Sequence, residues 1–513
     1  MSVLLNVSSS NKDNLISKIL EILKGADFCG QEPSVYTRLE NLLNRFKDDV
    51  WFVLESPYVD WHYRDTYYSY YSSKFKKIGR NCIRVHIFNK EITKDDLLNK
   101  DTDFKEKKYW GFFIIRPLIR YILGRSLISP EAFNVNNFVC CLMKDRVSLL
   151  GNEFTVCGFP HVAQDTETHT CAESSLWSFI EYYGSKYHRQ YKPLLPSQII
   201  KELSDNAEHR LLPSEGLTEK ELIKCLQNNG FQCIMHSPAP QAKLKNTIFP
   251  MLLQIYIESG IPLLLAIENK QDGHAMLVIG HEEDSIVNIK DHPFLKIASW
   301  IDVSFYPKNL VSIDDNMPPY QIIDILQPTD HYAYSRFKDM VISHFIVPLP
   351  MHVSLVAEKT YTLMKEILNT KGMSLEETGE KWITRLLLTN SRSFKNFINK
   401  ADNIIKNNKI TYKEMPHSVK EELLYLNMPR FIWICELYRL QNYSQNNGYC
   451  SGLLIIDATG DGKTLASVLW YAIDERKFTH NNIVWDKKYI PIEKFQMGTY
   501  RNNLKGGWNG WKS

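Results

Sequence analysis

The sequence predicts an α+β protein in which a capped helix packs on an antiparallel sheet. Apolar residues recur at three- and four-residue steps in several stretches, which is the period of an amphipathic helix. Short apolar runs bounded by glycines or polar loops are typical of buried strands. Because 513 residues exceed what one hydrophobic core normally holds, we expect two to four domains.

The composition is that of an ordinary globular protein, with 44% hydrophobic and 23% charged residues. A formal charge of +3 favours no general affinity for nucleic acid or for anionic membranes. Ten dispersed cysteines without a C-x-x-C motif predict neither a disulfide framework nor a metal site. The chain start lacks a secretion-signal pattern, and no window is apolar enough for a membrane span, so we expect a cytoplasmic protein.

Residues 1–150 are expected to form an N-terminal mixed α/β region. Helical periodicity is present near 12–24 and 34–47. The apolar runs CIRVHIF and WGFFIIRPLI predict strands.

Residues 151–350 are expected to form the core, beginning with a capped helix. Thr170 followed three residues later by Glu173 has capping-box spacing, and the apolar positions after it predict a helix that ends near Gly184. Two further helices should end at glycines, and four strands should follow. The helices are LTEKELIKCLQNNG and QAKLKNTIFPMLLQIYIESG, and the strands are IPLLLAI, HAMLVIG, SIVNIK and NLVSI.

Residues 351–513 are expected to form a C-terminal helical and β-hairpin region. VSLVAEKTYTLMKEIL and SLEETGEKWITRLLL predict two helices, the second opened by Ser374 and Glu377. GLLIIDATGDGKTLASVLWYAID alternates around a glycine-rich turn, which predicts a hairpin. Its GDGKT is not a phosphate loop, because that motif needs a glycine where Asp457 stands, so we predict no ATPase.

The stretch HTCAESSLWSFIEYYG places Cys171 in the first turn of the predicted core helix. Open amides and the helix dipole stabilise a thiolate there, although a lone cysteine is more often an inert packing residue. A reactive thiol also needs a base, and His274 begins an apolar strand after a polar loop. Neither feature is decisive alone, but together they indicate a cysteine nucleophile with a histidine base.

The stretches AQDTETHTCAESSLWSFIEYYG and IPLLLAIENKQDGHAMLVIGHEEDSIVNIKD together resemble the two catalytic segments of papain-like cysteine peptidases. Their form is closest to the bacterial peptidases that trim double-glycine leaders, and the likeness leaves both flanking regions unexplained. The resemblance implies a papain-like core, with Cys171 as nucleophile and His274 as general base and then acid. It also implies Gln164 as oxyanion donor beside the Cys171 amide. Gln164 precedes the cysteine by seven residues where papain has six, and Ala172 replaces the usual glycine.

The resemblance places the acid that orients the histidine at the end of the strand after the histidine strand. Asp291 closes SIVNIKD and has suitable spacing. Asp314 or Asp315 would take the role if residues 292–308 are an insertion, and the prolines that follow make a rigid exit from that strand. We favour Asp314, with Asp291 second.

These parts predict a thiol hydrolase that cleaves a peptide or isopeptide bond through a cysteine thioester. An acyltransferase with the same triad is an alternative, and so is a catalytically silent papain-like module that binds partners. We expect a protein or peptide substrate, no cofactor, and no general affinity for nucleic acid or membranes. The sequence indicates no oligomeric state.

Overall fold

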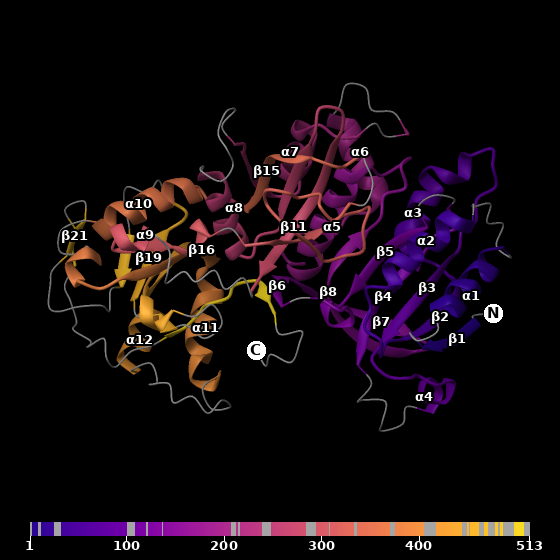
Figure 1. The fold of residues 1–513 in the computed structure, drawn as a ribbon, viewed down its shortest axis with the longest axis horizontal. Coiled ribbons are helices and arrows are strands. Elements are labelled where there is room, and N and C mark those ends of the chain that lie inside the picture. The colour runs from indigo at the N-terminus through magenta and orange to yellow at the C-terminus, as the bar shows by residue number, and fades with distance from the viewer. Residues whose placement is uncertain are drawn as a thin grey trace.

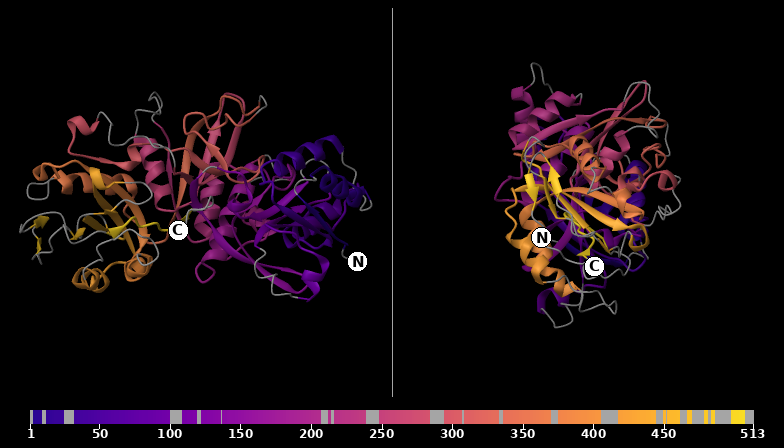
Figure 2. Two further views of the ribbon diagram at one scale, coloured as in Figure 1. Left: turned by 60° about the horizontal axis from the view of Figure 1, so that its bottom comes forward. Right: turned by 90° about the vertical axis from the view of Figure 1, so that its left-hand side faces the viewer.

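The chain forms three lobes in a row, which follow the sequence from the indigo end to the orange end in Figure 1. Figure 2 shows the same row from two other sides. No helix in the described part of the chain is both long and apolar enough to cross a lipid bilayer. The computed structural model describes residues 3–8, 12–24, 32–99, 108–118, 122–135, 137–206, 212–213, 216–238, 248–283, 294–306, 308–332, 336–369, 375–404, 417–443, 449–450, 452–460, 466–469, 478–480, 483–485 and 497–506.

The N-terminal lobe is a seven-stranded antiparallel sheet with helices, as the strand and helix patterns of this region predict. In sheet order its strands are β1 (Val3–Ser8), β2 (Trp51–Tyr58), β3 (Cys82–Phe88), β4 (Tyr109–Ile115), β5 (Leu123–Ile128), β8 (Asn152–Val162) and β7 (Met143–Leu149). The helices are α1 (Lys12–Lys24), α2 (Glu32–Leu43), α3 (Trp61–Ser69) and α4 (Lys94–Asn99).

The central lobe is an eight-stranded antiparallel sheet that draws strands from all three predicted regions. Its main path is β14 (Gln321–Ile323), β13 (Leu310–Ile313), β11 (Gly273–Glu282), β10 (Leu263–Glu268), β15 (Val341–Pro350) and β9 (Phe231–His236). Two more strands come from the predicted N-terminal and C-terminal regions: β6 (Phe138–Cys141) pairs with β11, and β24 (Leu504–Lys505) pairs with β6. The helices are α5 (Cys171–Lys186), α6 (Pro196–Asn206), α7 (Glu219–Asn228) and α8 (Ile248–Glu258).

The C-terminal lobe is a five-stranded sheet in which only the edge strand β12 runs parallel to its neighbour. The order is β12 (Trp300–Asp302), β16 (Trp382–Asn390), β17 (Phe431–Arg439), β19 (Gly452–Asp457) and β20 (Ala466–Leu469). The helices are α9 (Phe294–Ile297), α10 (Ala357–Asn369), α11 (Ser391–Ile404) and α12 (His417–Tyr425), and two small ribbons are β18 (Tyr449–Cys450) with β23 (Met497–Gly498) and β21 (Phe478–His480) with β22 (Ile483–Trp485).

The second predicted helix of the C-terminal region is wrong. SLEETGEKWITRLLL contains one short 3-10 turn at Leu375–Thr378 and then enters β16. Gly379 has a φ of 69°, which breaks the helical path, and β16 is buried on both faces between β12 and β17. A strand buried on both faces has a continuous apolar run, and such a run does not differ from a buried helix in its periodicity. Ser374 itself lies outside the described residues.

The predicted hairpin of this region is confirmed, because β19 pairs with β20 in antiparallel register. Its turn at 461–465 lies outside the described residues, as does the predicted strand SIVNIK. The capped core helix is also confirmed as α5, which continues two residues past Gly184. A Cβ at Gly184 would lie 2.4 Å from the backbone nitrogen of Pro193, so this glycine serves close packing rather than helix termination.

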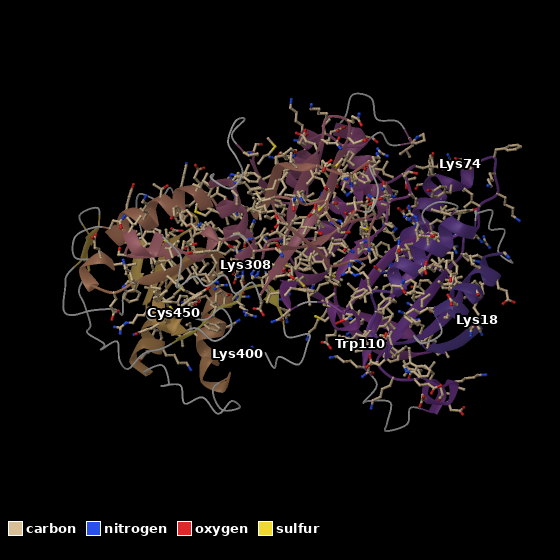
Figure 3. All side chains as sticks on the ribbon, in the orientation of Figure 1. Lys18, Lys74, Trp110, Lys308, Lys400 and Cys450 are labelled. Carbon is tan, nitrogen blue, oxygen red and sulfur yellow. The ribbon has the colours of Figure 1, made fainter. Side chains whose placement is uncertain are left out.

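A buried network of charges joins the central and C-terminal lobes. Arg385 of β16 bonds Glu258 of α8 at 2.9 Å and Glu436 of β17 at 2.7 Å. Lys308, labelled between the lobes in Figure 3, contacts Glu258 at 2.8 Å. Burial opposes the charge on Glu258, but the neighbouring cations hold its pKa well below the usual value. Because each charge is paired, removal of one partner would leave an uncompensated buried ion.

Close pairing of β6 with β11 requires a glycine at position 280. Gly280 lies opposite Cys140, and a Cβ there would lie 1.9 Å from the carbonyl oxygen of Val139. We expect Gly280→Ala to cost about 1–3 kcal/mol of stability and to lower the thermal unfolding midpoint. Gly273→Ala on the same strand is the matched control, because nothing lies within 4 Å of its added Cβ. Equal midpoints for the two variants would show that β6 does not pair as described.

Candidate active site

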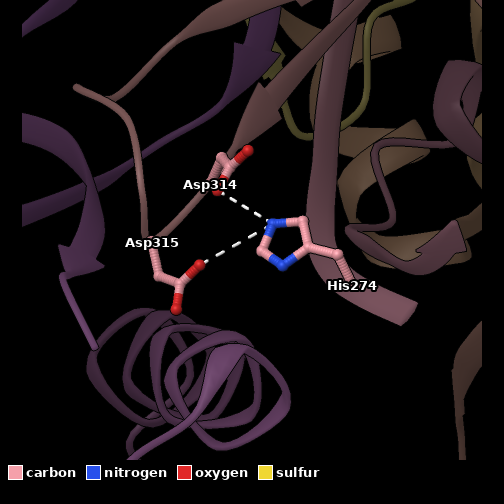
Figure 4. Close-up of side chains that lie close together, drawn as sticks. All are labelled: His274, Asp314 and Asp315. Atoms are coloured by element: carbon pink, nitrogen blue, oxygen red, sulfur yellow. Dashed lines mark hydrogen bonds and ion pairs between the residues drawn. The ribbon is translucent and has the colours of Figure 1, made fainter. Parts of the chain in front are cut away.

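The start of β11 meets two distant segments, the turn after β13 and the first turn of α5. Leu277 of β11 pairs with Ile313 of β13, and the two strands run in opposite directions. Residues before Leu277 therefore lie beside residues after Ile313, and this register places His274 next to Asp314. The imidazole Nε2 of His274 lies 3.0 Å from Oδ1 of Asp314 and 3.8 Å from Oδ1 of Asp315 (Figure 4).

Asp314 is a fully buried carboxylate that donors hold from several sides. Its Oδ1 also accepts a hydrogen bond from the backbone amide of Asn316 at 3.0 Å. Its Oδ2 accepts one from the hydroxyl of Tyr332 at 2.5 Å, and Nε2 of His331 lies 3.7 Å away. Burial alone would raise the pKa of Asp314. The charge and hydrogen bond of His274, together with the hydrogen bonds of His331 and Tyr332, hold this pKa well below its usual value. The group is therefore an ionised acceptor for the imidazole.

Cys171 is the first residue of α5 and is partly exposed. The carboxylate of Glu173 accepts hydrogen bonds from the amide of Thr170, at 3.0 Å, and from its hydroxyl, so the predicted capping box is present. Ser175 donates to the carbonyl of Ala275 at 3.4 Å, which ties this helix to β11 beside the histidine. The amino end of the helix, with its unpaired amides and positive dipole, therefore lies at the imidazole.

His274 lies beside the two carboxyl groups and near the first turn of α5. Figure 4 shows both aspartates on one ring nitrogen, while the second ring nitrogen points away from Asp314. Burial disfavours the charged ring, but the charge and hydrogen bond of Asp314, a side-chain hydrogen bond with Cys171 and the charge of Asp315 outweigh it. Together they hold the pKa of His274 well above its usual value, so the ring carries a transferable proton at neutral pH.

Asp315 is a second buried carboxyl with a different role. Its Oδ1 accepts a 3.3 Å hydrogen bond from the side chain of Asn316, and its buried Oδ2 has no hydrogen-bond partner among the described residues. Burial and the neighbouring charge of Asp314 raise the pKa of Asp315 to about 8, against the charge of His274. It is therefore mainly neutral at pH 7, while Asp314 is charged. Asp291, the other predicted acid, lies outside the described residues.

Gln164 follows β8 and lies against the turn that contains Asp314, Asp315 and Asn316. Its side-chain amide donates to Oδ1 of Asn316 at 2.6 Å, and its backbone carbonyl oxygen accepts a hydrogen bond from Arg116 at 3.2 Å. An amide nitrogen carries two hydrogens, so one remains for an oxyanion. The structure thus brings Cys171, His274, Asp314 and Gln164 to one place.

Sequence reasoning missed how Asp165 shapes the loop between Gln164 and Cys171. Its carboxylate accepts backbone hydrogen bonds from Glu167, Thr168 and His169 at 3.0, 2.7 and 2.9 Å. Thr166 has a φ of 62°, a strained value for a β-branched residue. An aspartate followed by polar residues is a known signal for such a side-chain-capped turn. These hydrogen bonds hold the loop that leads into α5.

Tyr332 and His161 are further supports that no local pattern could have revealed. Tyr332 comes from a turn eighteen residues after Asp314 and lies 3.4 Å from Nε2 of His274. His161 of β8 donates through Nε2 to the carbonyl of Asp314 at 3.1 Å, and burial lowers its pKa to about 4. A neutral His161 therefore supports the turn of Asp314 from the N-terminal sheet.

His274, Asp314 and Asp315 could in principle hold a metal ion, because their ligand atoms lie within 4.8 Å of one another. The described hydrogen bonds favour a proton instead. Nε2 of His274 is bonded to Asp314, whose oxygens also bind Asn316 and Tyr332. With the thiol of Cys171 on the same ring, the cluster has the connectivity of a proton relay.

The chain matches no protein-family model, and no curated protein is similar to it in sequence. The chemistry of the site must therefore be judged from its own geometry.

The raised pKa of Asp315 predicts a measurable pH dependence of stability. Its pKa rises from 3.8 to about 8 on folding, so the folded chain keeps a proton that the unfolded chain has lost. That contribution is complete below pH 4 and is lost as the pH rises to 8, by up to about 1.4 kcal/mol per pH unit. Asparagine has no such proton, so between pH 5 and 6 the thermal midpoint of Asp315→Asn should fall less, or rise more, than that of the wild type.

The window from pH 5 to 6 is chosen because His274 is then largely protonated in both the folded and the unfolded chain. Asp330→Asn is the control, because Asp330 is exposed. The same pH dependence in the wild type and Asp315→Asn would contradict a neutral buried carboxyl at this position.

Proposed function

We propose that the protein is a thiol hydrolase with a papain-like core, which cleaves a peptide or isopeptide bond. One observation carries this proposal: His274 of β11 lies 3.0 Å from the buried carboxylate of Asp314 and beside the first turn of α5, where Cys171 is the first residue. The proposed nucleophile, base and orienting acid come from separate segments, which is the division of roles that acyl transfer uses.

The mechanism follows from these contacts. His274 holds the proton of the Cys171 thiol as an imidazolium, and the thiolate attacks the acyl carbon of the substrate. The imidazolium, held by Asp314, then protonates the leaving amine, which leaves a thioester on the cysteine. Water, deprotonated by the same imidazole, hydrolyses the thioester and restores the thiol. Asp314 keeps its charge throughout and orients the ring.

The oxyanion of the tetrahedral intermediate needs donors beside the sulfur. The backbone amide of Cys171 lies at the start of α5, and Gln164 has a second amide hydrogen beyond the one that it gives to Asn316. One donor of this kind contributes on the order of 3 kcal/mol to the barrier. Gln164 is therefore expected to speed the reaction without being essential.

The charges of the site favour an enzyme over a silent binding module. A buried ion pair is costly to desolvate, and a binding module gains nothing from one at the end of a cysteine helix. Here the side chains of His274 and Asp314 are 1% and 0% exposed, while Cys171 stays partly exposed to solvent. Burial of the acid and base with access to the nucleophile is the arrangement that acyl transfer uses.

Selective alkylation tests the nucleophile. At pH 7 we expect iodoacetamide to modify Cys171 well before Cys157 or Cys233, which are also partly exposed. Burial raises the pKa of Cys157, and it raises that of Cys233 to about 12, so neither thiol is activated. His274→Ala should slow modification of Cys171 by about a hundredfold, as measured by peptide mass spectrometry.

A matched comparison guards against misfolding in that experiment. Cys157 and Cys233 report on the fold within the same sample, because their modification rates should be unchanged in His274→Ala. Alkylation of Cys171 at the wild-type rate in a variant that keeps those control rates would exclude the pairing.

Two kinds of thiol reagent test whether Gln164 stabilises an oxyanion. Dipeptide aldehydes, including a diglycine aldehyde, form a hemithioacetal whose oxygen needs donors, whereas iodoacetamide forms no oxyanion. We expect Gln164→Ala to weaken aldehyde inhibition of alkylation by about a hundredfold and to leave the alkylation rate alone. Gln232→Ala, at an exposed position of β9, is the control. Unchanged aldehyde affinity in Gln164→Ala would remove this residue from the mechanism.

A further inference from the structure

A cavity of about 580 Å³ lies at the other end of the nucleophile helix. Its walls come from the last turn of α5 and the segment after it, the turn after α8, the corner between β16 and α11, and the C-terminal segment. Tyr183, on its wall, lies twelve residues along α5 from Cys171, which corresponds to about 18 Å of helix. The cavity is therefore separate from the candidate active site. We refer to it as the lobe-junction cavity.

The charged residues that line the lobe-junction cavity are all basic. Arg392 and Arg430 line it, and none of its described lining residues is acidic. Arg392 forms no hydrogen bond or ion pair with any other described residue, and Arg430 donates to Oε1 of the neutral Gln190 at 2.7 Å. Two exposed arginines thus line the cavity, and neither forms an ion pair with a carboxylate in the described part of the chain.

The first turn of α11 adds to this positive field. Asn390 caps the helix by accepting from the amide of Ser393 at 2.7 Å, and Asn390, Ser391, Arg392 and Ser393 all line the cavity. The first turn of this fourteen-residue helix contains no acidic residue. The positive end of the helix dipole is therefore uncompensated at the cavity, as at the helix ends that bind phosphate groups.

The opposite wall is aromatic. Tyr183, Tyr187, Tyr191 and Phe431 line it. Tyr183 is only 4% exposed, and its hydroxyl forms no hydrogen bond within the described part of the chain. A polar atom of a ligand in this cavity can accept a hydrogen bond from this hydroxyl. This unpartnered group is an observation independent of the arginines and of the helix end.

We propose that the lobe-junction cavity binds a small organic phosphate with an aromatic ring, of the size of a mononucleotide. Arg392, Arg430 and the first turn of α11 would hold the phosphate, because guanidinium groups and helix ends match its oxygens. The ring would lie against the tyrosines. The volume falls within the range of small-ligand sites, and occupation would bridge the central and C-terminal lobes. The proposal is independent of the thiol chemistry at Cys171.

Calorimetry with the full-length protein tests this site. The probes are AMP, GMP, CMP and UMP, with the four nucleosides and inorganic phosphate as separate arms. We expect at least one mononucleotide to bind and to raise the thermal midpoint, and its nucleoside and free phosphate to bind about tenfold more weakly or worse. No binding by any mononucleotide, or equal binding by its nucleoside, would overturn the proposal.

Two variants locate the binding. Arg392→Ala should weaken the mononucleotide about tenfold, and because Arg392 holds no other described residue, the fold should be unaffected. Arg430→Ala should weaken it similarly. Arg146→Ala, at an exposed position of β7, is the control and should bind as the wild type does. Wild-type affinity in both Arg392→Ala and Arg430→Ala would place the binding elsewhere and overturn the proposal. Alkylation of Cys171 in these variants should stay at the wild-type rate, which separates this test from that of the proposed hydrolase.

Discussion

The antiparallel pairing of β11 with β13 is the constraint on which the candidate site depends. A shift of one residue in this register would turn the acid after β13 to the other face and remove the 3.0 Å contact between His274 and Asp314. The N-terminal lobe and strand β6 of the central sheet support the pairing. The sheet of the N-terminal lobe reaches the turn through His161, and β6 closes the far end of β11. The rigid scaffold thus determines where the imidazole lies.

Burial away from solvent, together with the neighbouring charges, determines the protonation states of Asp314, Asp315 and His274. Two adjacent carboxyls in one apolar setting cannot both ionise cheaply, so their pKa values move apart: Asp314 is lowered and Asp315 is raised to about 8. The charged carboxylate then raises the pKa of His274, against the cost of its burial. One environment therefore produces a charged acid that orients the ring and a neutral acid beside it. Neither role follows from residue type alone.

The sequence could predict the parts of the site that have local signals. The cap at Thr170 and Glu173, the helix after it and the strand of His274 all obey short-range rules. The paired acids and the prolines that follow them at a strand end favour Asp314, which lies 3.0 Å from His274. Contacts between distant segments have no such signal, so Tyr332 was missed. The helix expected over the start of β16 failed for another reason, since a strand buried on both faces loses its alternation. Burial of this segment between β12 and β17 therefore determines that it forms a strand, whereas its local pattern predicts a helix.

The central claim is that sulfur, imidazole and carboxylate share one relay, and the ionisation of His274 tests it most directly. Imidazole nitrogen NMR of protein labelled with ¹⁵N-histidine, with the signal assigned by its loss in His274→Gln, reports that ionisation. The account predicts an imidazolium that persists above pH 7 and titrates at lower pH in Cys171→Ser and in Asp314→Asn, because each change removes a contact that raises its pKa. A His274 that titrates at its ordinary value, unchanged by either substitution, would contradict it.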